Sequence, residues 1–191
     1  MNRTTSTKTM VMGAILTALV AILQLMGASI RLGPFSISLV LLPIVIGAAT
    51  CGKWIGAWLG LVFAIVVIAS GDAAAFLAVN PVGTVITVVA KGVLSGYLAA
   101  VCYGLFEKKN RYLATVVAAV VCPVVNTGVF LLGCLAFFME TVSGWAMEAG
   151  MGGNVAQYMI LFLVGGNFLF ELATNIILSP VVVRLLNIKK L

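Results

Sequence analysis

The sequence of 191 residues is 63% hydrophobic and only 8% charged, which is more apolar surface than one soluble core of this size can bury. Its formal net charge of +6 comes from basic residues spread over the ends of apolar runs, so a membrane explains the charge better than a nucleic acid does. The sequence contains no histidine, and its four cysteines have no C-x-x-C spacing, which argues against a metal site, a disulfide framework and most kinds of catalysis. We therefore expect an all-α membrane protein that is not an enzyme and carries no cofactor.

Six apolar segments predict six transmembrane helices within a single membrane domain, residues 1–191. All basic residues except Arg31 and Lys91 fall on the cytoplasmic side when the N-terminus is placed there, and the even number of spans returns the basic C-terminus to that side. The first span also resembles the apolar region of a signal peptide, but its length and this topology favour a helix that is retained. The spans are expected at about residues 10–30, 35–51, 54–71, 83–106, 112–138 and 156–186.

Two of the loops expected outside the cell are much longer than the inner connections. Residues 71–83 and 140–154 are rich in glycine, asparagine and aromatic side chains, which is typical of segments that cover or line a pocket. We therefore predict a ligand site that opens outward, with Asn80 and Trp145 as candidate covers. An asparagine before a proline is also an ordinary turn residue, so both interpretations of Asn80 stay open.

One short segment has the spacing of a phosphate-binding loop, G-x-x-x-x-G-K. Residues 47–53 read GAATCGK, but Trp54 stands where the motif needs a serine or threonine. The segment also joins two predicted membrane helices instead of a strand and a helix. We therefore predict no nucleotide site, and we interpret Lys53 as a cytoplasmic topology charge.

Small residues recur at a spacing of four in three of the predicted spans, which lets helix backbones approach closely in a membrane. In the first span Ala14 and Ala18 share a face with Ala21 close by, and both internal packing and docking of another membrane protein are open. In the third and fourth spans we interpret the pattern as internal packing. The residues concerned there are Gly52, Gly56, Gly60, Gly92, Gly96, Ala100 and Gly104.

A lysine lies inside the fourth predicted span. Lys91 is about two turns from the outer end, a depth of roughly 12 Å at 1.5 Å per residue, and a charge at the centre of a span costs ~2.5 to 3.5 kcal/mol. The lysine should therefore face protein or a water-filled cavity and have a partner. Candidate neighbours on the fifth and sixth spans are Asn126, Thr127, and the series Asn167, Glu171 and Asn175, which share a helix face at a spacing of four.

Two interpretations of this polar set are open. In the first, Lys91 and Glu171 form an ion pair that only fixes helix packing. In the second, they belong to a pocket in which Lys91 binds an anionic group, and we favour this one because ionisable groups inside membranes are usually functional and Arg31 adds a positive charge on the outer side. The predicted substrate-binding residues are Arg31, Asn80, Lys91, Asn126, Trp145, Asn167 and Glu171.

Several features together resemble the S component of energy-coupling factor (ECF) vitamin transporters. They are the size, the six spans, AILTA in the first span, and the segment FSISLVLLPIVIGAATCGKWIGAWLGLVFAIVVIASGD leading into NPVGTVITVVAKG. The resemblance covers essentially the whole chain. It implies a subunit of a bacterial cell membrane that binds one vitamin in an outward-facing cavity and topples in the bilayer to release it. It also implies that Ala14 and Ala18 pack on a transmembrane coupling subunit and that two partner ATPases hydrolyse the ATP.

The resemblance does not identify the vitamin. Arg31 and Lys91 favour an anion, and a carboxylate accepts charge-assisted hydrogen bonds from either. Only Tyr97, Phe130 and Phe168 are expected near the pocket, which does not indicate a large flat ring, so pantothenate is the first expectation. Folate, riboflavin and a corrinoid stay open. Alternatives of other classes are a structural or assembly membrane protein without a ligand and, less favoured because no inverted repeat is evident, an ion-coupled carrier.

Overall fold

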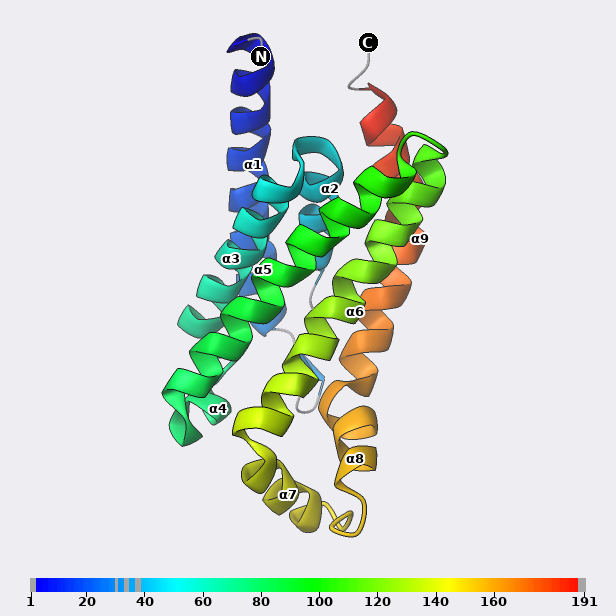
Figure 1. Cartoon of the computed structure of the whole chain (residues 1–191). Helices are drawn as coiled ribbons and strands as arrows, with labels where there is room; N and C mark the ends of the chain where they lie inside the picture. Colours follow the sequence, from blue (N-terminus) through cyan, green and yellow to red (C-terminus); the bar gives the residue numbers. More distant parts are fainter. Residues whose placement is uncertain (1–2, 30, 33–34, 37–38, 189–191) are drawn as a thin grey trace.

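The protein is a bundle of helices (Figure 1). This computed structural model describes residues 3–29, 31–32, 35–36 and 39–188, and the side chains of 7–27 and 39–184. A π-helical segment, η1, joins α8 to α9, and two short strands pair antiparallel. The elements are α1 (Arg3–Ser29), β1 (Arg31–Leu32), β2 (Phe35–Ser36), α2 (Leu41–Cys51), α3 (Lys53–Ala69), α4 (Ala74–Val79), α5 (Pro81–Phe106), α6 (Arg111–Phe137), α7 (Met139–Glu148), α8 (Val155–Tyr158), η1 (Met159–Gly165) and α9 (Gly166–Ile188).

The lengths and hydropathy of the helices confirm the helical membrane class. Two further apolar helices, α2 and α3, are shorter and occupy the positions of the second and third predicted spans. The segments long and apolar enough to cross a bilayer are Thr7–Gly27, Pro81–Phe106, Arg111–Phe137 and Val155–Arg184.

The start predicted for the second helix is wrong. The sequence led us to expect a helix from residue 35, whereas Phe35–Ser36 is a strand and the helix begins at Leu41. Phe35–Ser36 pairs antiparallel with Arg31–Leu32, and a count of apolar residues does not register such a pairing. The loops predicted at 71–83 and 140–154 also contain the short helices α4 and α7.

The short helix α2 lies at the centre of the bundle, where it contacts α1, α3, α5, α6 and α9. Its 11 residues extend only about 16 Å at 1.5 Å per residue. Leu41, Ile44 and Val45 are each at most 1% exposed, so the helix is surrounded by protein. Leu42, Ile46 and the last three residues of α2 are partly exposed, and the other six are buried, which fits its largely apolar sequence.

Helices α3 and α5 pack with their backbones in direct contact. A Cβ atom added at Gly60 would meet the Gly92 carbonyl oxygen, and one added at Gly96 would meet the Gly56 carbonyl oxygen. The packing interpretation of these four glycines is therefore confirmed. Gly104 takes no part, because a Cβ there would meet nothing within 4 Å. Gly52 also has open space around it and serves the connection between α2 and α3, with φ 87°.

The two ends of the bundle differ in character. The start of α1 and the end of α9 lie at one end, and α4, α7 and α8 lie at the other (Figure 1). Two long helices begin with asparagine caps: the Asn80 side chain accepts a hydrogen bond from the Gly83 amide in α5, and the Asn110 side chain accepts one from Leu113 in α6. These caps fix where α5 and α6 start, and α5 and α6 form two walls of the cavity described next.

Candidate functional site

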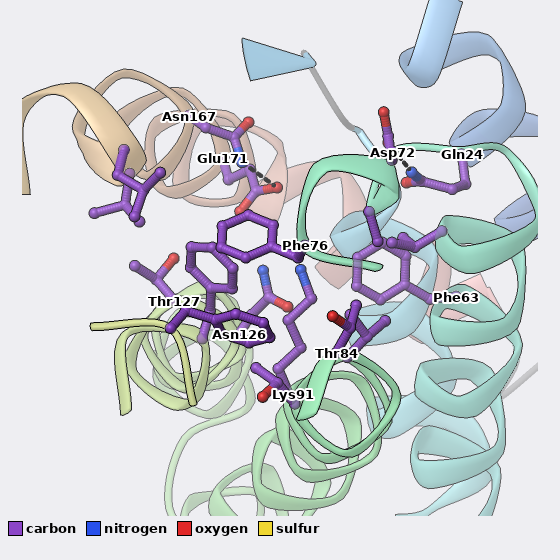
Figure 2. A pocket seen from close by; sticks show the side chains of 18 residues that line it. Gln24, Phe63, Asp72, Phe76, Thr84, Lys91, Asn126, Thr127, Asn167 and Glu171 are labelled. Atoms are coloured by element: carbon purple, nitrogen blue, oxygen red, sulfur yellow. Dashed lines mark hydrogen bonds between the residues drawn. The ribbon is translucent and has the colours of Figure 1, made fainter. Parts of the chain in front are cut away.

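A cavity of about 180 Å³ lies between α3, α5, α6 and α9, and its lining includes Phe76 of α4 and Phe138, which directly precedes α7 (Figure 2). At ~10 to 15 Å³ for each water, this is room for on the order of ten water molecules or one small organic ligand. Its wall combines apolar side chains with an unusual number of polar ones for the interior of a membrane bundle. The polar and charged lining residues are Gln24, Asp72, Thr84, Thr87, Lys91, Asn126, Thr127, Asn167 and Glu171.

Lys91 extends from the middle of α5 into this cavity (Figure 2). Its Nζ atom lies 5.4 Å from the centroid of the Phe63 ring and 5.3 Å from that of the Phe130 ring. Such cation–π contacts offset part of the cost of placing an ammonium group inside the bundle. Within the described part of the chain, no carboxylate lies close enough to Lys91 for an ion pair. The ammonium group is therefore held by aromatic rings and directed at the cavity.

Glu171 enters the cavity from α9, on the same helix face as two asparagines. Asn167 Nδ2 donates a hydrogen bond of 3.3 Å to Glu171 Oε1, and Asn175 Nδ2 donates one of 2.9 Å to the Glu171 backbone carbonyl. The carboxyl group is 2% exposed. The spacing of four therefore assembles one polar face on α9, and Asn167 and Glu171 form the part of it that lines the cavity.

Several buried oxygens around the cavity have no hydrogen-bond donor. Asn126 is 4% exposed and Thr87 is 5% exposed, so neither has free access to bulk solvent. An unpaired buried polar atom costs ~1 to 3 kcal/mol, which makes such a cluster rare unless water or a ligand serves it. Among the described residues, the unpaired atoms that belong to the lining are Thr87 Oγ1, Asn126 Oδ1, Asn167 Oδ1 and Glu171 Oε2.

A group of aromatic rings closes the cavity on the side of α4 and α7. The Phe76 ring, on α4, lies edge to face with Phe130 at 5.5 Å, Phe138 at 5.0 Å and Trp145 at 5.4 Å between ring centroids. Phe76, Phe130 and Phe138 line the cavity, and Trp145 backs Phe76 from α7 without being part of the lining. We call these four residues the aromatic cover.

Four of the residues predicted to bind a substrate thus share one cavity: Lys91, Asn126, Asn167 and Glu171. Asn80 does not line it, because its side chain caps α5. Trp145 reaches it only through Phe76. The Arg31 side chain lies outside the described residues, so its predicted contact with an anion stays a prediction.

The lining is more aromatic than the sequence led us to expect. Phe130 is present, but Tyr97 and Phe168 are not among the residues that line the cavity. Tyr97 instead lies 6.1 Å from the Trp54 ring, on a different part of the bundle. Phe63 and Phe76 were missed because their positions on α3 and α4 follow from how these helices pack against α5, which hydropathy does not encode.

Sequence reasoning also missed four polar residues of the lining, which are Gln24, Asp72, Thr84 and Thr87. Gln24 Nε2 donates a hydrogen bond of 2.7 Å to Asp72 Oδ2, which links α1 to the turn after α3. Gln24 had a usable signal, because it is a buried amide within an otherwise apolar membrane helix. Thr87 had one as well, since it precedes Lys91 by four residues and so shares its helix face.

The predicted docking pair lies on the outer surface of α1. Ala14 and Ala18 are both exposed, whereas Leu16, Val20 and Gln24 on the other side of the helix are buried. The small-residue face of α1 is therefore not used for packing against the described part of this chain, in contrast to the glycines of α3 and α5.

Comparison with known proteins gives one match, to a protein-family model. A family model described as "ECF transporter, substrate-specific component" matches residues 8–186. No curated protein and no solved structure gives a match. Members of the matched family are substrate-binding subunits of a membrane transporter and not enzymes. Because the match spans nearly the whole chain, the chain belongs to the family of substrate-specific components of ECF transporters.

Proposed function

We propose that this chain captures a water-soluble vitamin in the cavity between α3, α5, α6 and α9, and that the vitamin is pantothenate. The observation that carries the proposal is the Lys91 ammonium group, which is directed into the cavity and has no ion-pair partner among the described side chains. A carboxylate of the cargo supplies that partner. The alternative in which Lys91 and Glu171 only fix helix packing is less well supported, because it leaves both the cavity and its unpaired oxygens without a role.

The charges around the cavity restrict the cargo. The lining holds one ammonium group, from Lys91, and two carboxylates, from Asp72 and Glu171. A ligand with a single carboxylate is therefore tolerated better than one with two, which favours pantothenate over folate. The volume of about 180 Å³ disfavours a corrinoid, which is far larger.

The dimethyl group of pantothenate suits an apolar wall, and its hydroxyl and amide groups suit the unpaired oxygens. Riboflavin is the second candidate, because the phenylalanines of the lining offer surfaces for a ring system. Pantothenate remains the first choice because Phe76 already engages Phe130 and Phe138 edge to face, and because riboflavin has no carboxylate for Lys91.

The remaining parts of the proposal concern the membrane and the partners. We propose six spans, with α2 and α3 as the second and third, and both termini in the cytoplasm of a bacterial cell. The cavity then opens outward, since Phe76 of α4 lines it and α4 lies at the end of the bundle opposite the start of α1 and the end of α9 (Figure 1). The exposed Ala14 and Ala18 face of α1 docks on the transmembrane coupling subunit, and two partner ATPases supply the energy. Arg31 adds to the attraction for an anion at the outer side.

Identification of the bound cargo tests the proposal. The protein is purified in detergent without added vitamin, denatured, and the released small molecules are identified by mass spectrometry. Titration calorimetry with pantothenate, riboflavin, folate and cobalamin follows on protein freed of its cargo. We expect pantothenate to be released and to bind most tightly. If riboflavin is released and binds most tightly instead, the substrate is riboflavin and not pantothenate. If the protein binds none of the four, the structural alternative is supported.

A further inference from the structure

Three of the four unpaired oxygens of the cavity lining come from α6 and α9, and the fourth, Thr87 Oγ1, comes from α5. Asn126 contributes Oδ1 from α6, and Asn167 Oδ1 and Glu171 Oε2 come from α9. Figure 2 shows Asn167 and Glu171 on one wall and the Lys91 side chain rising from the wall formed by α5. The cavity therefore presents a positive group from one wall and a set of hydrogen-bond acceptors from the others.

Local bonds do not satisfy these acceptors. Glu171 Oε1 receives the Asn167 amide, but Glu171 Oε2 receives no donor, and the Asn167 amide oxygen is also without one among the described residues. Carboxylate and amide oxygens can only accept, so no rearrangement among these acceptor atoms removes the deficit. Among the described residues none donates to these three oxygens, and a hydroxyl group of a bound cargo can supply a donor.

A buried carboxylate discriminates strongly between cargo molecules that bring donors and those that do not. A hydroxyl or N–H group that reaches Glu171 Oε2 forms a charge-assisted hydrogen bond, which is about twice as strong as a neutral one. A cargo without a donor displaces water and leaves the carboxylate unpaired. Sites built to bind a hydroxyl group reject analogues that lack it for this reason. A second anionic group at this place would meet the negative charge of Glu171 directly.

We infer that Asn126, Asn167 and Glu171 form a second subsite in the same cavity as the anion-binding Lys91, and that this subsite selects cargo by its hydroxyl groups. The inference rests on the proposed function and makes it more specific, since it requires a cargo with two unlike ends. One end carries a single anionic or acceptor group, and the other carries at least one hydroxyl group.

The test compares a ligand that has hydroxyl groups with one that lacks them. Pantothenate is compared with dideoxypantothenate, in which hydrogen replaces both hydroxyl groups while the amide and the carboxylate remain. Calorimetry is performed on the wild type, on Glu171→Gln and on a matched control, Ser179→Ala. Ser179 is a buried polar residue on the same helix, donates only to the Ile176 carbonyl and does not line the cavity.

We expect the wild type and Ser179→Ala to bind pantothenate roughly 10- to 100-fold more tightly than dideoxypantothenate, and Glu171→Gln to lose most of this ratio. The inference is overturned if the wild type binds both ligands equally, or if Glu171→Gln keeps the full ratio. Should Glu171→Gln fail to fold, the comparison of the two ligands on the wild type still decides, because it needs no variant.

The inference and the proposed substrate fail in different ways. If the wild type binds riboflavin and not pantothenate, the proposed substrate is wrong, and the same ratio is measured with riboflavin against lumiflavin, which lacks the hydroxyl-bearing chain. A ratio that depends on Glu171 then supports the donor subsite, and a ratio of about one overturns it. If no vitamin binds, the cargo-binding proposal falls and the inference falls with it.

Discussion

Gln24 on α1 donates a hydrogen bond of 2.7 Å to Asp72 in the turn after α3, and both residues line the cavity. The bond joins the first helix to the wall of the site. Gln24 is 2% exposed, so its amide cannot turn to bulk solvent when the bond is broken. The position therefore contributes to the stability of the cavity wall as well as to its polarity.

Replacement of this amide should destabilise the protein. Gln24→Leu keeps the size of the side chain but removes a donor to a carboxylate, which costs about 1.5 to 3 kcal/mol. We expect a lower midpoint in thermal unfolding of the detergent-purified protein. Gln157→Leu is the control, because Gln157 is exposed and only its backbone amide is engaged, by Asn154. Equal midpoints for the two variants would contradict the assigned role of Gln24.

The contact between α3 and α5 predicts that alanine substitutions at two glycines of α5 change the stability of the protein by very different amounts. A Cβ atom in Gly92→Ala would meet the Gly60 carbonyl oxygen and the Ala64 methyl group, so the two helices have to separate. We expect a loss of about 1 to 3 kcal/mol. Gly104→Ala has open space and should be neutral or stabilising by up to about 1 kcal/mol, because alanine favours helices. Unfolding midpoints in a detergent series measure both, and similar values for the two would show that the helices are not in backbone contact.

The aromatic cover should control how fast cargo leaves. Phe76 touches three rings, so Phe76→Ala opens the end of the cavity near α4 and α7. We expect dissociation of the vitamin to accelerate by roughly tenfold or more, while association changes less. Phe162→Ala is the control, because Phe162 stacks on Tyr158 and does not line the cavity. Stopped-flow fluorescence measures both rates, and an unchanged dissociation rate in Phe76→Ala would remove the covering role.

Because the alanine face of α1 is exposed, we predict that substitutions on it block transport without affecting vitamin binding. Ala14→Trp combined with Ala18→Trp should leave vitamin affinity unchanged, since both residues point away from the cavity, and should abolish uptake and co-purification with a coupling subunit. Leu132→Trp with Leu135→Trp places two tryptophans on an exposed part of α6 instead and should spare both uptake and co-purification. Normal uptake by the α1 variant would remove the docking assignment.

The polar residues within apolar runs were the part of the site that the sequence could predict. Lys91 and the series Asn167, Glu171 and Asn175 stand out because charge and amide groups are costly in a membrane, and helical periodicity then shows which of them share a face. The aromatic cover was harder to predict, because Phe76 and Phe138 come from segments that pack together only in the tertiary structure. The start of α2 was mispredicted because Phe35–Ser36 is apolar enough for a span and yet forms a strand.

Asn80 illustrates a different difficulty. Its place in a long loop that we expected outside the cell indicated contact with a ligand, but the residue stands directly before Pro81, where an asparagine caps a helix well. The local explanation, a hydrogen bond of 2.9 Å from the Gly83 amide, accounts for the side chain without a ligand. Loop position alone is therefore weaker support for a binding role than burial beside a cavity.

The most direct test of the account is the affinity of Lys91→Met for pantothenate and for panthenol, in which an alcohol replaces the carboxylate. If Lys91 binds the carboxylate, the variant should bind pantothenate about 100-fold more weakly than the wild type, bind panthenol with unchanged affinity, and remain folded. Lys109→Met, at an exposed position beyond α5, should change neither affinity. Full affinity of Lys91→Met for pantothenate, together with a lowered unfolding temperature, would contradict the account and assign Lys91 to helix packing.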